Sequence, residues 1–403
     1  MNDASRSTQQ SPFPDDNSAA VGMLPTVLRT ILYAALFCAI ATAGYATFRA
    51  TQEQAASRDS QDRLVAYHGL TQTTGKRLAP PYKDKDGDLL ADAPSDPQQL
   101  LDPDTLVLAH YKDADADTQL VDWDALQAHL AQATGKKVVT QEYLNSADDV
   151  AAIKAKTIQV IALHAADAPY VVNNAGFVPF AVLGTEAGAH HGNHLDVAAG
   201  PTSEIKTLAD LRGHTLTCTA PDSITGYRAA IAVLAEQTGM RPDVDYFINF
   251  SHGQKRSVLG LAGGDFEVAA LSDDKVHSLL DKGSIDKSDY RVIYESEVIP
   301  RLTIGYICDL NPALTAKIAA ATIDFANEGG ADEESTGNPM RFFASDYKQD
   351  FAFVRKIDDS FDPRFHKRPV MIPVPEGQAG TATPAESAAP ADSSAPAEAP
   401  VVE

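Results

Sequence analysis

Residues 215–230 read T-L-T-C-T-A-P-D-S-I-T-G-Y-R-A-A, and this stretch predicts a strand, a break and a helix start in close succession. Polar and apolar residues alternate over 215–219, as they do in a strand that buries one face. Pro221 and Asp222 then interrupt the strand, and helical spacing follows over 227–237. A strand that leads directly into a helix is the repeating unit of α/β folds.

The predicted helix start carries residues suited to an anion. Ser223, Thr225 and Gly226 stand where a helix exposes unpaired N–H groups and the positive end of its dipole. Two hydroxyls and a residue without a side chain would let a small oxyanion approach those groups. The simpler interpretation is that Ser223 or Thr225 only caps the helix.

A second helix start of the same kind follows. A strand over 246–250 leads to Ser251 and His252, and a helix is expected over 255–262. Ser251 is predicted to cap this helix, and His252 to lie beside its first N–H groups. Two such helix starts can converge on one crevice at the strand ends.

The rest of the folded region alternates in the same way, which predicts parallel sheets covered by helices. Strands are expected at 105–111, 137–141, 158–163, 178–183, 268–271 and 302–307, with helices at 123–133, 147–156 and 168–174.

The N-terminus contains one apolar segment. Residues 31–48 carry no charge and lie between Arg29 and Arg49, which is close to the minimum for a membrane-spanning helix. Residues 1–22 are polar and predicted to be disordered. The small residues at 41–43 also fit a signal-peptide cleavage site, but the long polar leader favours an uncleaved anchor.

Composition excludes some classes of partner. The 403 residues carry a formal net charge of −22, which argues against a nucleic acid. It does not argue against a recessed anion site, which depends on local donors. Cys38, Cys218 and Cys308 have no metal-ligand spacing, and whether Cys218 and Cys308 pair is left open.

Two polar runs could suggest a metal, and neither predicts one. Asp84 to Asp92 resembles a calcium loop, but Leu89 stands where an EF-hand needs glycine, so a solvated acidic turn is preferred. His190, His191 and His194 lack acidic or cysteine partners and a helical frame, so an exposed polar loop is expected.

Several phrases occur in a recognisable order over 208–325: L-A-D-L-R-G-H-T-L, P-D-S-I-T-G-Y, F-S-H, G-G-D-F-E-V-A-A-L and D-L-N-P-A-L. Together they resemble the phosphate/phosphite/phosphonate-binding proteins of ABC importers, and the resemblance extends over about 104–360. It implies a bilobal, periplasmic-binding-protein-like (type II) α/β fold, with two mixed lobes joined by a hinge that close on the ligand.

The resemblance also implies roles for individual residues. An S-T-S-G-like motif that holds the oxyanion matches Ser223, Ile224, Thr225 and Gly226, and Ile224 departs from it by lacking a hydroxyl. The family's histidine matches His252, which follows Ser251. In the first lobe the candidates are His164, where the family has a small or polar residue, and Tyr143, the nearest aromatic residue.

These inferences predict a membrane-anchored solute-binding protein, with no enzymatic activity, cofactor or metal. Its partners would be a small phosphorus oxyanion and an ABC permease with its ATPase, with the soluble part on the periplasmic side. A sensor or scaffold on the same fold is the alternative, and an enzyme is less favoured because no nucleophile–base pair is found. The expected organisation is a tail (1–29), an anchor (30–49), a stalk (50–103), lobe 1 (104–205 and 302–370), lobe 2 (206–301) and a disordered Pro/Ala/Glu-rich tail (371–403).

Overall fold

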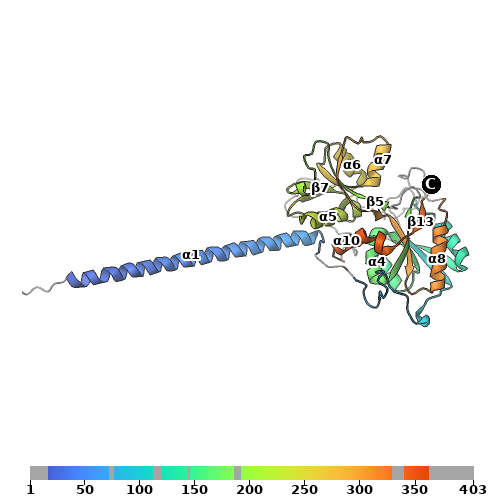
Figure 1. Cartoon of the computed structure of the whole chain (residues 1–403), viewed down its shortest axis with the longest axis horizontal. Coiled ribbons are helices and arrows are strands. Elements are labelled where there is room, and N and C mark those ends of the chain that lie inside the picture. Colours follow the sequence, from blue (N-terminus) through green and yellow to red (C-terminus); the bar gives the residue numbers. More distant parts are fainter. Residues whose placement is uncertain are drawn as a thin grey trace, which may run out of the picture.

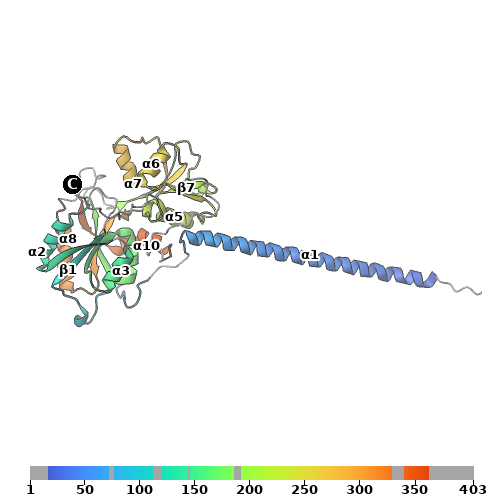
Figure 2. The same cartoon turned by 180° about the vertical axis from the view of Figure 1, so that it is seen from behind.

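The computed structural model describes residues 17–71, 77–111, 120–143, 146–185, 192–328 and 340–362. Two α/β lobes lie side by side, and a long helix projects from the region where they meet (Figures 1 and 2). The predicted two-lobed α/β fold is confirmed.

The first lobe is built on a six-stranded sheet with the order β13-β4-β12-β3-β1-β2. The parallel strands β1, β3 and β2 lie together, and β12 runs antiparallel between β3 and β4. Their bounds are β1 (Thr105–Tyr111), β2 (Lys137–Tyr143), β3 (Val160–His164), β4 (Phe177–Gly184), β12 (Leu302–Ile307) and β13 (Arg341–Ala344). The helices of this lobe are α2 (Trp123–Thr134), α3 (Ser146–Lys154), α4 (Ala168–Ala175) and α8 (Pro312–Asp324), with the short helices η1 (Pro97–Gln99) and η2 (Ala165–Asp167).

The second lobe is built on a five-stranded sheet with the order β10-β6-β9-β7-β8, in which β8, β7 and β9 are parallel. The strands are β6 (Leu195–Ala199), β7 (Thr215–Cys218), β8 (Phe247–Phe250), β9 (Val268–Ser272) and β10 (Arg291–Glu295). The helices are η3 (Leu208–Leu211), η4 (Ile224–Arg228), α5 (Ala229–Thr238), α6 (Gln254–Ala262) and α7 (Asp273–Asp281). This lobe was expected to start at residue 206, but its sheet already includes β6, which pairs with β9 and β10.

Two short strands join the sheets. The chain enters the second sheet through β5 (Gly192–Asn193) and returns through β11 (Ile299–Pro300), and these two strands pair antiparallel. Gly192 is needed here because a Cβ at this position would lie 2.2 Å from the carbonyl oxygen of Ile299. The crossovers are therefore held together as a single narrow link.

The N-terminal helix α1 (Asn17–Tyr67) is longer at both ends than the sequence patterns predicted. It begins within the 1–22 segment that was expected to be disordered, and it continues well into the predicted stalk. Residues 49–67 contain no glycine or proline and are rich in alanine, arginine and glutamine, all of which favour helix. Hydropathy therefore located the apolar span, whereas helix propensity extends the helix beyond it.

The last helices pack where the lobes meet. After β13, α9 (Tyr347–Asp350) and α10 (Ala352–Asp359) complete the described chain, with Phe353 and Val354 buried. Figure 1 places α10 between the lobes, next to the end of α1. The predicted tail over 371–403 lies outside the described residues.

Candidate functional site

The strand-to-helix turn forms, but its helix begins earlier than predicted. The wide turn η4 starts at Ile224 rather than at residue 227, and the amide of Arg228 donates to the carbonyl of Ser223 over 3.0 Å. The Ser223 side chain accepts a hydrogen bond from the amide of Gly226 at 3.0 Å, so this hydroxyl does cap the helix. Apolar spacing missed this turn because it has π rather than α geometry, a form that is rare and often found at functional sites.

Gly226 is required by the close approach of the preceding strand. The amide of Thr219 donates to the carbonyl of Gly226 at 2.8 Å. A Cβ on Gly226 would lie 2.1 Å from the Thr219 hydroxyl oxygen and 2.9 Å from that of Ser223. The glycine therefore lets the strand end and the turn pack together.

The second helix start lies next to the first. The amides of Ser251 and His252 donate to the carbonyls of Cys218 and Thr219, at 2.9 and 2.8 Å. His252 is exposed and has a φ of +62°, a conformation that is uncommon for any residue except glycine. The backbone thus holds this histidine beside the turn that carries Ser223 and Thr225.

The prediction that Ser251 caps the second helix was wrong. The helix α6 begins at Gln254, its N-cap is Gly253, and no side chain caps it. The buried Ser251 hydroxyl lies 2.5 Å from that of Ser257 and donates to the carbonyl of Gly253 at 3.2 Å. Its hydroxyl is thus occupied by partners in the loop and in the first turn of α6.

Gln254, which the sequence did not single out, joins the two helix starts. Its Nε2 lies 3.1 Å from the hydroxyl oxygen of Thr225 and 3.4 Å from that of Ser223. Its Oε1 accepts a hydrogen bond from the amide of Ser272 at the end of β9, over 3.2 Å. The backbone amide can only donate, so it fixes the Gln254 side-chain amide with its NH₂ group toward the hydroxyls.

This orientation has a chemical consequence for the site. Each hydroxyl oxygen accepts from Gln254, and each hydroxyl hydrogen therefore remains available to an outside acceptor. Thr225 is 4% exposed, so a hydrogen bond from it to an anion would form in a setting with little competing water. The arrangement suits a ligand with negatively charged oxygens.

In the first lobe, three ring-bearing residues stand at the carboxyl ends of neighbouring strands. Tyr143 ends β2 and pairs in register with Tyr111, which ends β1. His164 ends β3, and its ring centroid lies 4.5 Å from that of Tyr111 in an edge-on arrangement. The structure thus brings the candidates Tyr143 and His164 next to Tyr111, which the sequence analysis did not single out. The place of Tyr111 as the last residue of a predicted strand was the signal that could have identified it.

One ion pair connects the turn η4 to the first lobe. Arg228 Nη2 lies 4.0 Å from Asp167 Oδ1, and Asp167 ends η2 just after His164. Arg228 Nη2 also donates to the carbonyl of Asp222 at 3.3 Å. The carboxyl ends of the strands in both lobes are thus linked through Arg228.

Buried carboxyl groups lie beside the crossovers. Asp196 in β6 is 6% exposed, and burial, followed by the nearby charges of Asp273 and Glu295, raises its pKa to about 7. Burial also raises the pKa of Asp273, although the amide of His194 donates to it at 2.7 Å. Asp273 directly follows Ser272, whose amide donates to Gln254, so one of these carboxyl groups lies one residue from the hydroxyl site.

Among the described residues, the two runs that could suggest a metal form no buried site. The carboxylates of Asp84, Asp86 and Asp88 come together but are exposed, and the amides of Gly87 and Leu89 donate to Asp84. His190 and His191 lie outside the described residues, and His194 Nδ1 is bonded to the carbonyl of Ser296. Cys38, Cys218 and Cys308 are free thiols, which answers the question of pairing.

A two-lobed α/β fold with paired crossovers and polar groups at the strand ends of both lobes is typical of periplasmic-type substrate-binding proteins, because ligands of open α/β sheets bind at the carboxyl ends of the strands. The family model described as "ABC transporter, phosphonate, periplasmic substrate-binding protein" matches residues 111–342, which is more than half of the chain. The chain therefore belongs to this family.

Solved structures are similar in fold and distant in sequence. XAC2383 from Xanthomonas citri, bound to ATP, has a TM-score of 0.51 and 15% identity, over 64% of this chain and 100% of that one. PhnD1 from Prochlorococcus marinus, in complex with methylphosphonate, has a TM-score of 0.44 and 13% identity, over 64% and 100% of the two chains. No curated protein matches the chain in sequence.

Proposed function

We propose that the protein captures a small phosphorus oxyanion (a phosphonate, phosphite or phosphate) between its lobes and delivers it to an ABC permease and its ATPase. The family supplies the transport role. The ligand class is supported by one observation: Gln254 donates to the hydroxyl oxygens of Ser223 and Thr225, which leaves both hydroxyl hydrogens free to donate. Hydrogen bonds to a charged acceptor are stronger than those between neutral groups, and two hydroxyl donors held by the same Gln254 amide could supply them here.

The same proposal includes a membrane anchor. Of the helices in the described residues, one is long and apolar enough to cross a membrane: Thr26–Tyr67, with a mean hydropathy of 1.7 in its most apolar window. A signal sequence passes the same test. An uncleaved anchor is favoured because a long polar leader precedes the apolar span, which is unusual for a signal peptide. The lobes would then lie on the periplasmic side.

Two substitutions test the ligand site: one removes a hydroxyl donor, and the other changes the direction in which the hydroxyls donate. Thr225→Ala removes one donor and should weaken binding about ten- to a hundred-fold. Gln254→Glu keeps an acceptor for the amide of Ser272 but offers only acceptors to the hydroxyls, which should turn toward it and away from the ligand. The added negative charge would also repel the anion, so we expect the greater loss in this variant.

Binding is measured by calorimetry with methylphosphonate, phosphite and phosphate, using the full chain in detergent or nanodiscs. Thr322→Ala is the matched control, since it removes a buried hydroxyl bonded to the carbonyl of Ile318 in the first lobe. Its affinity should match that of the unmodified protein. Equal affinities for Thr225→Ala, Gln254→Glu and this control would place the ligand elsewhere.

A further inference from the structure

The end of the long helix is joined directly to the turn that carries the candidate site. His68, the first residue after α1, is 2% exposed. Its Nδ1 lies 2.7 Å from the hydroxyl of Tyr227, and its Nε2 lies 2.7 Å from Asp243 Oδ2. A carboxylate only accepts, so Nε2 carries a proton. Tyr227 directly follows Gly226 in η4, so one side-chain contact separates the membrane helix from the site turn.

The same short segment is also bound to the other side of the junction. Leu70 forms an antiparallel bridge with Phe361, just after α10. The amide of Thr71 donates to the carbonyl of Ser360, and the amide of Asp362 donates to that of Gly69, each over 2.8 Å. The helix α10 follows β13 of the first sheet and packs against α4. Residues 68–71 therefore contact the second lobe through the His68 side chain, and they contact the end of α10 through backbone hydrogen bonds.

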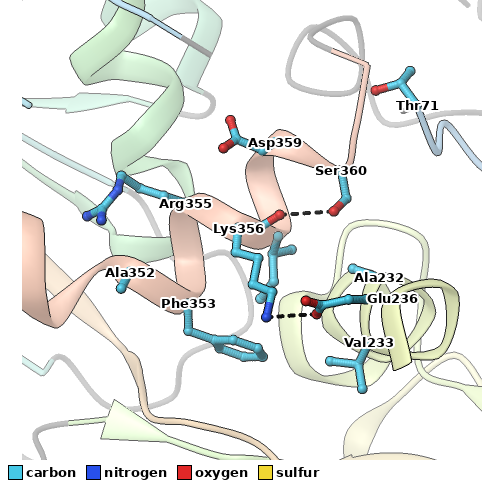
Figure 3. Close-up of a pocket in the computed structure, with 11 residues that line it drawn as sticks. Thr71, Ala232, Val233, Glu236, Ala352, Phe353, Arg355, Lys356, Asp359 and Ser360 are labelled. Carbon is cyan, nitrogen blue, oxygen red and sulfur yellow. Dashed lines mark hydrogen bonds and ion pairs between the residues drawn. The ribbon is translucent and has the colours of Figure 1, made fainter. Parts of the chain in front are cut away.

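The helices α5 and α10 on either side of this segment touch, but an open pocket separates part of their facing surfaces. A cavity of about 410 Å³ lies between α5 and α10, and Thr71 also lines it (Figure 3). Lys356 of α10 reaches across to Glu236 of α5 over 2.7 Å, and both side chains are about half exposed. Ion pairs this exposed hold two elements together only weakly. Since α5 continues directly from η4, a shift of the site turn toward or away from α10 has room to occur here.

We propose that the His68–Tyr227 contact relays occupancy of the ligand site to the membrane helix. The inference rests on the proposed function, because it takes the oxyanion at η4 as its input. When a ligand draws the lobes together, η4 and α5 move relative to α10, and the segment bound to both must follow. The last turns of α1 then differ between the empty and the loaded protein. Coupling between two sites is reciprocal, so the state of the helix also sets the affinity of the site.

The experiment follows residues 61–71 by hydrogen exchange in the full chain in lipid nanodiscs, with and without saturating methylphosphonate. Tyr227→Phe removes only the hydroxyl that meets His68. Tyr246→Phe is the matched control, since it removes a buried hydroxyl of the same lobe that has no hydrogen-bond partner among the described residues. We expect methylphosphonate to change exchange over 61–71 in the unmodified protein and in Tyr246→Phe. In Tyr227→Phe the change should be lost.

A second variant, His68→Gln, tests the other partner of the contact and should also lose the change. Calorimetry on the same samples keeps the two proposals distinct. Methylphosphonate binding without any change over 61–71, or an equal change in Tyr227→Phe and His68→Gln, would overturn the relay alone. If methylphosphonate, phosphite and phosphate all fail to bind the unmodified protein, the proposed function falls, and the relay falls with it.

Discussion

The buried carboxyl group of Asp196 makes the free energy of unfolding depend on pH. Its Oδ1 is buried and has no hydrogen-bond partner among the described residues, and Asp273 and Glu295 add like charge nearby. Its pKa is about 7 in the folded protein and near 3.8 in an unfolded chain. Between these values the folded state holds a proton that the unfolded state has released, so the free energy of unfolding falls as the pH rises through this range.

We therefore expect Asp196→Asn to flatten the pH dependence of stability. The unmodified protein should lose about 2–3 kcal/mol more than the variant between pH 5 and pH 8, because an amide does not titrate in this range. Urea unfolding at the two pH values measures the difference. Asp265→Asn, at an exposed position, should keep the slope of the unmodified protein. Parallel slopes for both variants would show that Asp196 is ionised throughout.

Sequence patterns predicted only part of the candidate site. Ser223, Thr225 and Gly226 could be proposed from the sequence because hydroxyls and glycine at a strand-to-helix step are a local signal. Gln254 was missed because its partners are about thirty positions away in the chain and nothing in its neighbours indicates them. His68 was missed for the same reason, since its partner Tyr227 is 159 positions away.

At the scale of elements, the paired crossovers β5 and β11 control how the two sheets are joined. Their register puts Gly192 opposite Pro300, and a Cβ on Gly192 would collide with the backbone of Ile299. Replacing a glycine that lies against backbone atoms is destabilising, because the neighbouring backbone cannot move aside by changing a rotamer as a side chain can.

Gly192→Ala should accordingly separate the crossovers and destabilise the fold by about 1–3 kcal/mol. Thermal and urea unfolding of the ligand-free protein measure the effect. Gly200→Ala is a suitable comparison, because the nearest atom to its added Cβ would be 3.4 Å away, an ordinary contact. The prediction fails if both substitutions leave the unfolding midpoint unchanged.

Most strands and helices were predictable because alternating patterns are set by each segment alone, but β6 was not predicted, and both sheets expected to be parallel contain antiparallel strands. Sheet membership was not predictable in every case. The strand β6 is buried along its whole length, and its neighbours β9 and β10 come more than sixty residues later, so its sequence does not say which sheet it joins. The helix α1 was underestimated because only its apolar part was considered, whereas its polar continuation is held by helix propensity.

For the whole molecule, the proposed anchor fixes where each end of α1 lies. A cysteine at Ser60 should be labelled by a membrane-impermeant maleimide in spheroplasts, because residue 60 lies beyond the apolar span and is exposed. A cysteine at Ser7 should be labelled only after lysis. The background from native Cys38 is measured in the unmodified protein. Labelling of Ser7→Cys but not of Ser60→Cys in intact spheroplasts would reverse the orientation.

With the proposed anchor uncleaved, the unbroken length of α1 would also set the geometry of encounters with a permease. From residue 48 to Tyr67 the helix continues for about 19 residues, or about 28 Å at the usual rise per residue. A binding protein anchored by such a helix would move in a thin layer along the membrane surface and would meet a permease by lateral diffusion. The rate of encounter then depends on the number of molecules per area of membrane. A change in the volume of the surrounding compartment leaves that number unaltered.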